Sequence, residues 1–159
     1  MNKLDTFQKV LYVVGHSFAF QRSKSGGFIS SARGVIDGLS GHGYEIHIVS
    51  DTLLPGVLNE ENKKYHFYKY RLLRRFIPVK SSLNFKNFLS RIDNVLFRYS
   101  VKKILNELID VNNYKFIYLR ASQSGHSIAK IADRNNIPLI LEVNKPLSMG
   151  PYNKRDGLA

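Results

Sequence analysis

The sequence predicts an α/β fold of one domain, built on a doubly wound parallel sheet of about five or more strands in the order 3-2-1-4-5. Short apolar or β-branched runs alternate along the 159 residues with segments of helical periodicity. Strands joined by helices imply right-handed crossovers and therefore a parallel sheet. With 43% hydrophobic residues, a chain of this length has a globular composition and can bury roughly 70% of its unfolded surface.

The first predicted unit, residues 9–51, contains a strand, a Gly-Gly turn, a helix and a second strand. Residues 10–14 are an unbroken apolar run typical of a buried parallel strand, and residues 44–49 alternate into the second strand. Gly26 and Gly27 precede the helix, whose unpaired N–H groups can face a phosphate. The spacing matches neither GxGxxG nor GxxxxGK[ST], so an ordinary helix-opening turn is an equal alternative.

The rest of the chain continues the alternation of strands and helices. In the resulting sheet, ligands are expected beyond the carboxyl ends of the strands, near the switch in strand order. The remaining predicted elements are a strand at 65–71, a long amphipathic helix at 84–109, a strand at 116–119, a short helix at 127–135 and a strand at 138–143, followed by an irregular tail.

Four polar residues are candidates for a site at this edge of the sheet. Arg120 and Glu142 end the fourth and fifth predicted strands, where a guanidinium can bind an anion and a carboxylate can act as a base or bind a sugar hydroxyl. A structural ion pair between them is the alternative. His126, at a loop-to-helix junction, and Asn144, in the predicted tail, are candidate ligand contacts; a solvated histidine and a turn hydrogen bond are the ordinary explanations.

No metal or cofactor is expected from the sequence. The chain has no cysteine, and its five histidines show no HExxH motif or other paired ligand spacing. No signal peptide is recognised, and no run approaches the roughly 18 apolar residues that a membrane-spanning helix needs. A cytoplasmic location is therefore expected.

The positive charge is concentrated in residues 63–103, which hold twelve Lys/Arg against Asp93 alone. This bias predicts an anionic partner. Aromatic residues between the cations favour an anionic membrane surface, at which each engaged cation contributes about 1 kcal/mol. RNA would satisfy the same electrostatics, but no RNA-binding signature is present, so nucleic acid is the less favoured partner. The candidate surface residues are Arg71, Arg74, Arg75, Arg91, Arg98 and Lys102.

Four segments, in this order and spacing, resemble the N-terminal domain of family 4 glycosyltransferases of the GT-B fold, especially bacterial polysaccharide-assembly enzymes. They are KVLYVV, GHGYEIHIVSD, YKFIYLRAS and IPLILEVNKPLS, and the resemblance covers nearly the whole chain. It implies a Rossmann-like acceptor-binding domain over residues 1–159, with Gly26 and Gly27 facing the donor diphosphate or the acceptor. Arg120 stands where many relatives have histidine. Family catalysis is retaining, metal-independent and electrostatic.

The resemblance also sets expectations about partners. The nucleotide sugar would be a co-substrate bound by a C-terminal domain, which is not found here, so the chain is expected to be an incomplete domain without activity by itself. A separate chain is one source of the missing domain. The expected partners are a glycan or lipid-linked acceptor and the inner face of the plasma membrane. Two alternatives stay open: a basic α/β nucleic-acid-binding module and a small, complete nucleotide-binding protein of the same fold.

Overall fold

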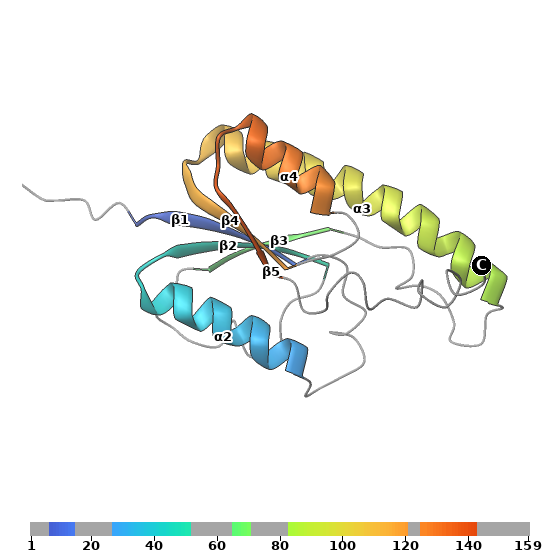
Figure 1. Cartoon of the computed structure of the whole chain (residues 1–159), viewed down its shortest axis with the longest axis horizontal. Coiled ribbons are helices and arrows are strands. Elements are labelled where there is room, and N and C mark those ends of the chain that lie inside the picture. The colour runs from blue at the N-terminus through green and yellow to red at the C-terminus, as the bar shows by residue number, and fades with distance from the viewer. Residues whose placement is uncertain (1–6, 15–26, 52–64, 71–82, 121–124, 143–159) are drawn as a thin grey trace, which may run out of the picture.

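The computed structural model describes residues 7–14, 27–51, 65–70, 83–120 and 125–142, and within the helices it leaves the side chains of 27–29, 83–91, 93 and 94 undescribed. These ranges form one α/β domain (Figure 1). Its elements are β1 (Lys9–Val14), α2 (Gly27–Gly41), β2 (Glu45–Ser50), β3 (Tyr65–Lys69), α3 (Leu83–Val111), β4 (Tyr114–Arg120), α4 (Gly125–Arg134) and β5 (Leu139–Glu142).

The five strands form a parallel sheet in the order β3-β2-β1-β4-β5, which confirms the predicted fold class and strand order. In the central strand β1, Tyr12 is in register with Ile48 of β2 and Tyr118 of β4. Residues 10–14 are all fully buried. A central parallel strand is covered on both faces, which explains why this run lacks the alternation of polar residues seen in half-exposed strands.

The helices cover both faces of the sheet, with α2 on one side and α3 and α4 on the other (Figure 1). Successive residues of β1 point to opposite faces, so the strand contributes to two separate cores. On the α2 side, Tyr12 packs with Ala32 and Ile36. On the other side, Leu11 and Val13 belong to the core of α3 and α4.

The end of α2 is fixed by a Schellman motif at Gly43. This glycine has φ 81°, its N–H donates to the carbonyl of Ser40 (2.9 Å), and the N–H of Tyr44 donates to the carbonyl of Leu39 (3.2 Å). Both bonds satisfy carbonyls that the helix end would otherwise leave unpaired. The chain then enters β2, whose first residue is bonded through its N–H to the carbonyl of Gln8 (3.0 Å) at the amino end of β1.

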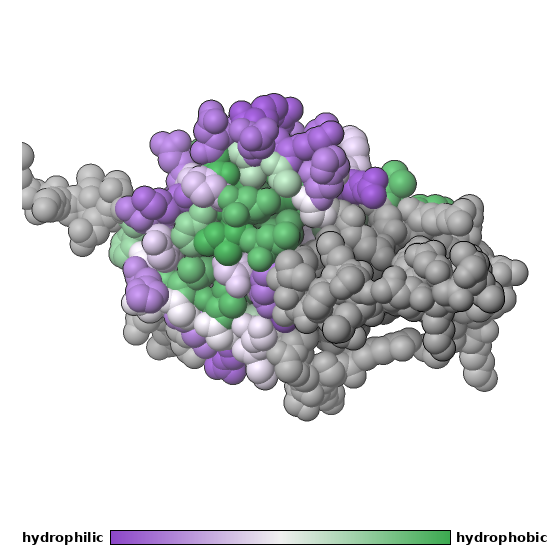
Figure 2. All heavy atoms as spheres, viewed as in Figure 1, coloured by the Kyte–Doolittle hydropathy of each residue, from purple (hydrophilic) through white to green (hydrophobic). Residues whose placement is uncertain are grey.

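Element boundaries differ from the predictions by one to two residues. The structure extends α3 to Leu83 and Val111, and β4 begins at Tyr114, two residues before the apolar run on which the prediction relied. The edge strand β5 is half-exposed: Ile140 and Leu141 retain 45% and 52% of their surface. Figure 2 shows an apolar patch on this side of the molecule, in the region of β4 and β5.

Candidate functional site

Three side chains from different elements meet at the carboxyl edge of the sheet: Ser31 of α2, Arg120 of β4 and Glu142 of β5, here called the carboxyl-edge cluster. Arg120 and Glu142 are in register on neighbouring strands, and Arg120 Nη2 lies 3.5 Å from Glu142 Oε1. Arg120 Nη1 donates to Ser31 Oγ (3.2 Å), which in turn donates to Glu142 Oε1 (3.4 Å). The cluster lies beside the switch between β1 and β4, where ligands of doubly wound folds bind.

The two charged side chains of the cluster are largely sheltered from water, whereas Ser31 is exposed. The side chain of Arg120 is 4% exposed and that of Glu142 is 16% exposed. Separating either charge from its partner would therefore cost several kcal/mol, more than at an exposed pair. The sheltered position strengthens any interaction of these groups with a ligand in the same way, because less solvent screens the charges.

Two tyrosines lie close to these charges. Burial raises the pKa of Tyr12 to about 12, although Arg120 acts in the opposite direction. Burial and the Glu142 carboxylate also raise the pKa of Tyr118. Both hydroxyls therefore stay neutral near pH 7. Tyr12 is fully buried, whereas Tyr118 and Ser31 give the edge accessible hydroxyl groups beside one cation and one carboxylate, which are the groups that bind polyols and phosphates in proteins.

Arg120 and Glu142, the two residues predicted to be catalytic, lie together in the structure. They form the ion pair that was the alternative interpretation of these residues. Gly27 is the first residue of α2, and His126 is exposed in the first turn of α4. Arg98 and Lys102 are exposed on α3, which also contains Arg91, whose side chain is not described. The other predicted site residues, Gly26, Asn144, Arg71, Arg74 and Arg75, lie outside the described residues.

A second polar cluster lies at the opposite, amino edge of the sheet and consists of Glu45, His47 and His66, here called the amino-edge cluster. Glu45 Oε1 lies 3.0 Å from His47 Nε2 and 3.2 Å from His66 Nε2. His47 of β2 and His66 of β3 are directly opposite in the register. The side chain of His47 is 4% exposed, whereas that of His66 is 54% exposed.

Neighbouring residues hold this cluster in place. Tyr114 Oη lies 2.6 Å from His47 Nδ1, and Lys9 Nζ lies 3.8 Å from Glu45 Oε1. Burial lowers the pKa of His47 below its ordinary value, against the opposing effect of the Glu45 hydrogen bond. For Glu45, burial alone would raise the pKa, but the His47 hydrogen bond and the charges of Lys9 and both histidines outweigh it and lower the pKa overall.

The amino-edge cluster was not predicted from the sequence. Its two histidines have no metal-ligand spacing along the chain, because His47 and His66 come from neighbouring strands. The available signals were that Glu45 and His47 are two residues apart on a predicted strand and hence share a face, and that the next strand contains another histidine. The strand register that makes the two histidines neighbours cannot be read from the sequence alone.

No protein-family model and no curated protein matches this chain. Solved structures similar to it include two crystal structures of the C-terminal domain of a hydrogenase from Pyrococcus furiosus. Their TM-scores are 0.54 and 0.56 at 12% and 11% identity, and each match covers 86% of this chain and 92% of the other. At this level of identity the similarity supports the α/β fold and carries no argument about activity.

Proposed function

We propose that this chain is the acceptor-side N-terminal domain of a retaining GT-B glycosyltransferase, and that the carboxyl-edge cluster binds a glycan or lipid-linked acceptor. The observation that carries this proposal is the convergence of Ser31, Arg120 and Glu142 at the carboxyl edge of strands beside the switch in strand order. The resemblance of the four sequence segments to family 4 N-terminal domains supports the same assignment.

In this proposal each residue of the cluster has a role toward the acceptor. The Glu142 carboxylate accepts a hydrogen bond from an acceptor hydroxyl, and the Arg120 guanidinium binds a phosphate of the acceptor or stabilises negative charge on the leaving diphosphate. Ser31 connects the two side chains and orients both. In this proposal the nucleotide sugar is bound by a second domain.

Titration of the ¹⁵N-labelled chain with glucose 1-phosphate, which combines sugar hydroxyls with a phosphate, tests the acceptor site by NMR. We expect saturable shifts at the ends of β4 and β5 that are lost in Arg120→Lys and Glu142→Gln. Arg134→Lys, an exposed cation in the last turn of α4, is the matched control.

Two outcomes of this titration would overturn the proposal. Shifts that persist unchanged in Arg120→Lys would place the ligand elsewhere. Saturable binding of UDP-glucose or ATP to the lone chain, dependent on Arg120, would favour the complete nucleotide-binding protein over the acceptor domain.

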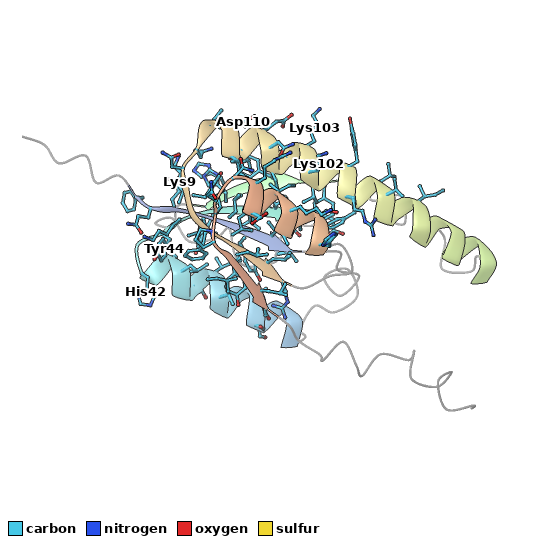
Figure 3. All side chains as sticks on the ribbon, turned by 45° about the horizontal axis from the view of Figure 1, so that its top comes forward. Lys9, His42, Tyr44, Lys102, Lys103 and Asp110 are labelled. Atoms are coloured by element: carbon cyan, nitrogen blue, oxygen red, sulfur yellow. The ribbon has the colours of Figure 1, made fainter. Side chains whose placement is uncertain are left out.

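We propose further that the outer face of α3 rests on an anionic membrane. Val95, Arg98, Tyr99 and Lys102 recur at spacings of three and four residues, which place them on one side of the helix. Val95 and Tyr99 retain 65% and 70% of their surface, and both cations beside them are exposed. Figure 3 shows Lys102 on the outer side of α3. Apolar groups flanked by cations suit the boundary between acyl chains and anionic head groups.

The proposed association is at the membrane surface. Among the described helices, none combines the length and the apolar character that crossing a bilayer requires. Two engaged cations contribute about 2 kcal/mol, or roughly a 30-fold change in partitioning, at moderate salt. The apolar contribution of Val95 and Tyr99 adds to this, but it would be present with neutral lipid as well.

Sedimentation with vesicles tests this surface. We expect recovery with phosphatidylglycerol vesicles to exceed that with phosphatidylcholine vesicles, and to fall roughly 30-fold in partition coefficient for Arg98→Gln/Lys102→Gln. Lys130→Gln/Arg134→Gln on α4 removes the same charge and is the control. Equal losses in the two double variants, or equal recovery with the two lipids, would overturn the proposal. Salt-sensitive binding of single-stranded RNA without vesicle binding would favour the nucleic-acid alternative.

A further inference from the structure

The amino-edge cluster has the dimensions of a tetrahedral metal site. A Zn²⁺ ion with bonds of about 2.0–2.1 Å to nitrogen and oxygen separates its ligand atoms by roughly 3.4 Å. Glu45 Oε1 lies 3.0 Å from His47 Nε2 and 3.2 Å from His66 Nε2, and all three atoms lie within 4.8 Å of one another. The His66 side chain is 54% exposed, so it can move to shorten the separation between the two imidazoles.

We propose that Glu45, His47 and His66 bind a Zn²⁺ ion at the amino edge of the sheet. Two imidazoles and one carboxylate are a ligand set that Zn²⁺ uses with a fourth position left to water or another ligand. Mg²⁺ and Ca²⁺ prefer oxygen ligands throughout, so the two nitrogens select against them. This site is independent of the proposed sugar transfer, because it lies at the opposite end of the strands from the carboxyl-edge cluster.

Tyr114 supports the imidazole that is almost fully buried. A histidine that binds a metal through Nε2 must carry its proton on Nδ1, and a partner that accepts this proton fixes the ring. Tyr114 Oη lies 2.6 Å from His47 Nδ1. The hydroxyl can donate to Nδ1 while Nε2–H donates to Glu45, and it can accept from Nδ1–H when Nε2 binds an ion. The same contact therefore serves both tautomers.

Lys9 opposes metal binding. Its Nζ lies 3.8 Å from Glu45 Oε1 and donates to Asn112 Oδ1 at 2.6 Å, so a positive charge stands beside the proposed ion. The Lys9 side chain is one-third exposed, which allows it to turn toward water when the ion enters. Replacing it with a neutral side chain should therefore raise the affinity for Zn²⁺.

A bound ion would connect two strands. His47 belongs to β2, and His66 belongs to β3, which is an outer strand of the described sheet and is paired there with β2. Coordination would add a link between these strands beyond their main-chain hydrogen bonds. We therefore expect the ion to stabilise the β3 side of the sheet and to raise the melting temperature of the whole domain.

Calorimetric titration of the full chain, stripped of metal and freed of any histidine tag, tests the site. We expect one Zn²⁺ ion to bind and Mg²⁺ to give no signal at the same concentrations. His66→Asn should weaken Zn²⁺ binding at least 100-fold, and Tyr114→Phe about 10-fold because the ligand itself remains. Lys9→Gln should strengthen it. His42→Asn, which removes an exposed histidine that follows α2, is the matched control and should bind as the parent does.

Spectroscopy separates this site from adventitious binding to scattered histidines. Co²⁺ in a tetrahedral site gives strong visible absorption, which should appear in the parent and in His42→Asn and be lost in His66→Asn. The His66 side chain is more than half exposed, so this variant should keep the fold, and its circular dichroism should match that of the parent. Zn²⁺ binding of equal strength in His66→Asn and the parent, or no binding to either, would overturn the proposal.

Discussion

The hydroxyl of Tyr70 donates a hydrogen bond of 2.9 Å to the main-chain carbonyl of Val14. Tyr70 follows β3, whereas Val14 ends β1, and β2 lies between these two strands. The ring of Tyr70 is 1% exposed and packs edge-on against Phe97 of α3, with 5.0 Å between the ring centroids. One side chain thus holds the carboxyl end of β1 in a position where Val14 is paired with Arg120.

Tyr70→Phe should lower the free energy of unfolding by about 1–3 kcal/mol, because the ring still fills its space while the Val14 carbonyl loses its partner. Urea denaturation followed by circular dichroism measures this change. Tyr44→Phe, at the other end of the sheet and partly exposed, is the control and should change stability by less than about 0.5 kcal/mol. A Tyr70→Phe protein as stable as the parent would mean that water or another group replaces the bond.

Alanine substitutions at two glycines, one within α2 and one just after it, should change the stability of the protein in opposite directions. Gly38 lies within the helix, and a Cβ there would meet no atom within 4 Å, so Gly38→Ala should stabilise the protein by about 0.5–1 kcal/mol. At Gly43 space is also open, but φ is 81°, so Gly43→Ala should destabilise by about 1–2 kcal/mol. Thermal denaturation of the pair tests both signs. Destabilisation by both variants would contradict the open space at Gly38.

The fold was predictable because its signals are local. The buried run of residues 10–14 and the alternation of β2 mark strands, and the helical periodicity of α3 is sustained over many turns. Once strands alternate with helices, the handedness of the crossovers leaves few arrangements, and the order β3-β2-β1-β4-β5 is the simplest of them. Boundaries were less certain, since β4 begins with Tyr114 and Lys115, before the apolar run on which the prediction relied.

The two clusters differ in how far the sequence could predict them. Arg120 and Glu142 end strands, and topology alone places such residues at one edge, so their proximity was expected. Ser31 was missed because nothing in the sequence of a helix specifies which turn faces a neighbouring strand. The contact between His47 and His66 depends on the register of β2 against β3, which packing determines.

The amino-edge cluster should make metal-free protein sensitive to acid. The pKa of His47 lies below its ordinary 6.5, so the unfolded chain binds more protons at this residue than the folded chain does. The stability that neutral His47 contributes to the fold is complete above about pH 6.5 and falls as the pH drops below this value. The pKa of Glu45 lies below its ordinary 4.5, so its contribution is lost at lower pH, in the same direction. Lys9, His66, Tyr68 and Tyr114 surround the pair.

Urea denaturation in the presence of a chelator, between about pH 7.5 and about pH 5.5, isolates the histidine contribution, because the pKa of the Glu45 carboxylate lies below this range. We expect the parent to lose stability over this range and His47→Gln to lose less, since glutamine does not titrate. His42→Asn serves as the control for an exposed histidine. If His47→Gln and the parent showed the same pH dependence, the His47 assignment would be wrong.

The ion pair between Arg120 and Glu142 is compatible with both a structural and a ligand-binding role. A double-mutant cycle with two readouts distinguishes these roles. Arg120→Met should destabilise the protein by about 3 kcal/mol, at the lower end for a buried pair because Arg120 Nη2 and Glu142 Oε1 lie as far as 3.5 Å apart. Glu142→Gln should cost less, because an amide can still accept a hydrogen bond from Ser31. We expect the double variant to cost less than the sum of the two, with a coupling of about 0.5–3 kcal/mol.

The second readout is binding of glucose 1-phosphate to those variants that remain folded. If the pair serves only the fold, Glu142→Gln will lose stability and bind the probe as the parent does. If the cluster contacts the acceptor, Glu142→Gln will weaken binding by about one hydrogen bond to a charged group, or roughly 10-fold to 100-fold, whatever its stability. Ser31→Ala provides the intermediate case, since it removes the bridging hydroxyl and leaves both charges in place. If binding of the probe depends on the charge of residue 142 and stability depends on the intact ion pair, the same two residues have both roles.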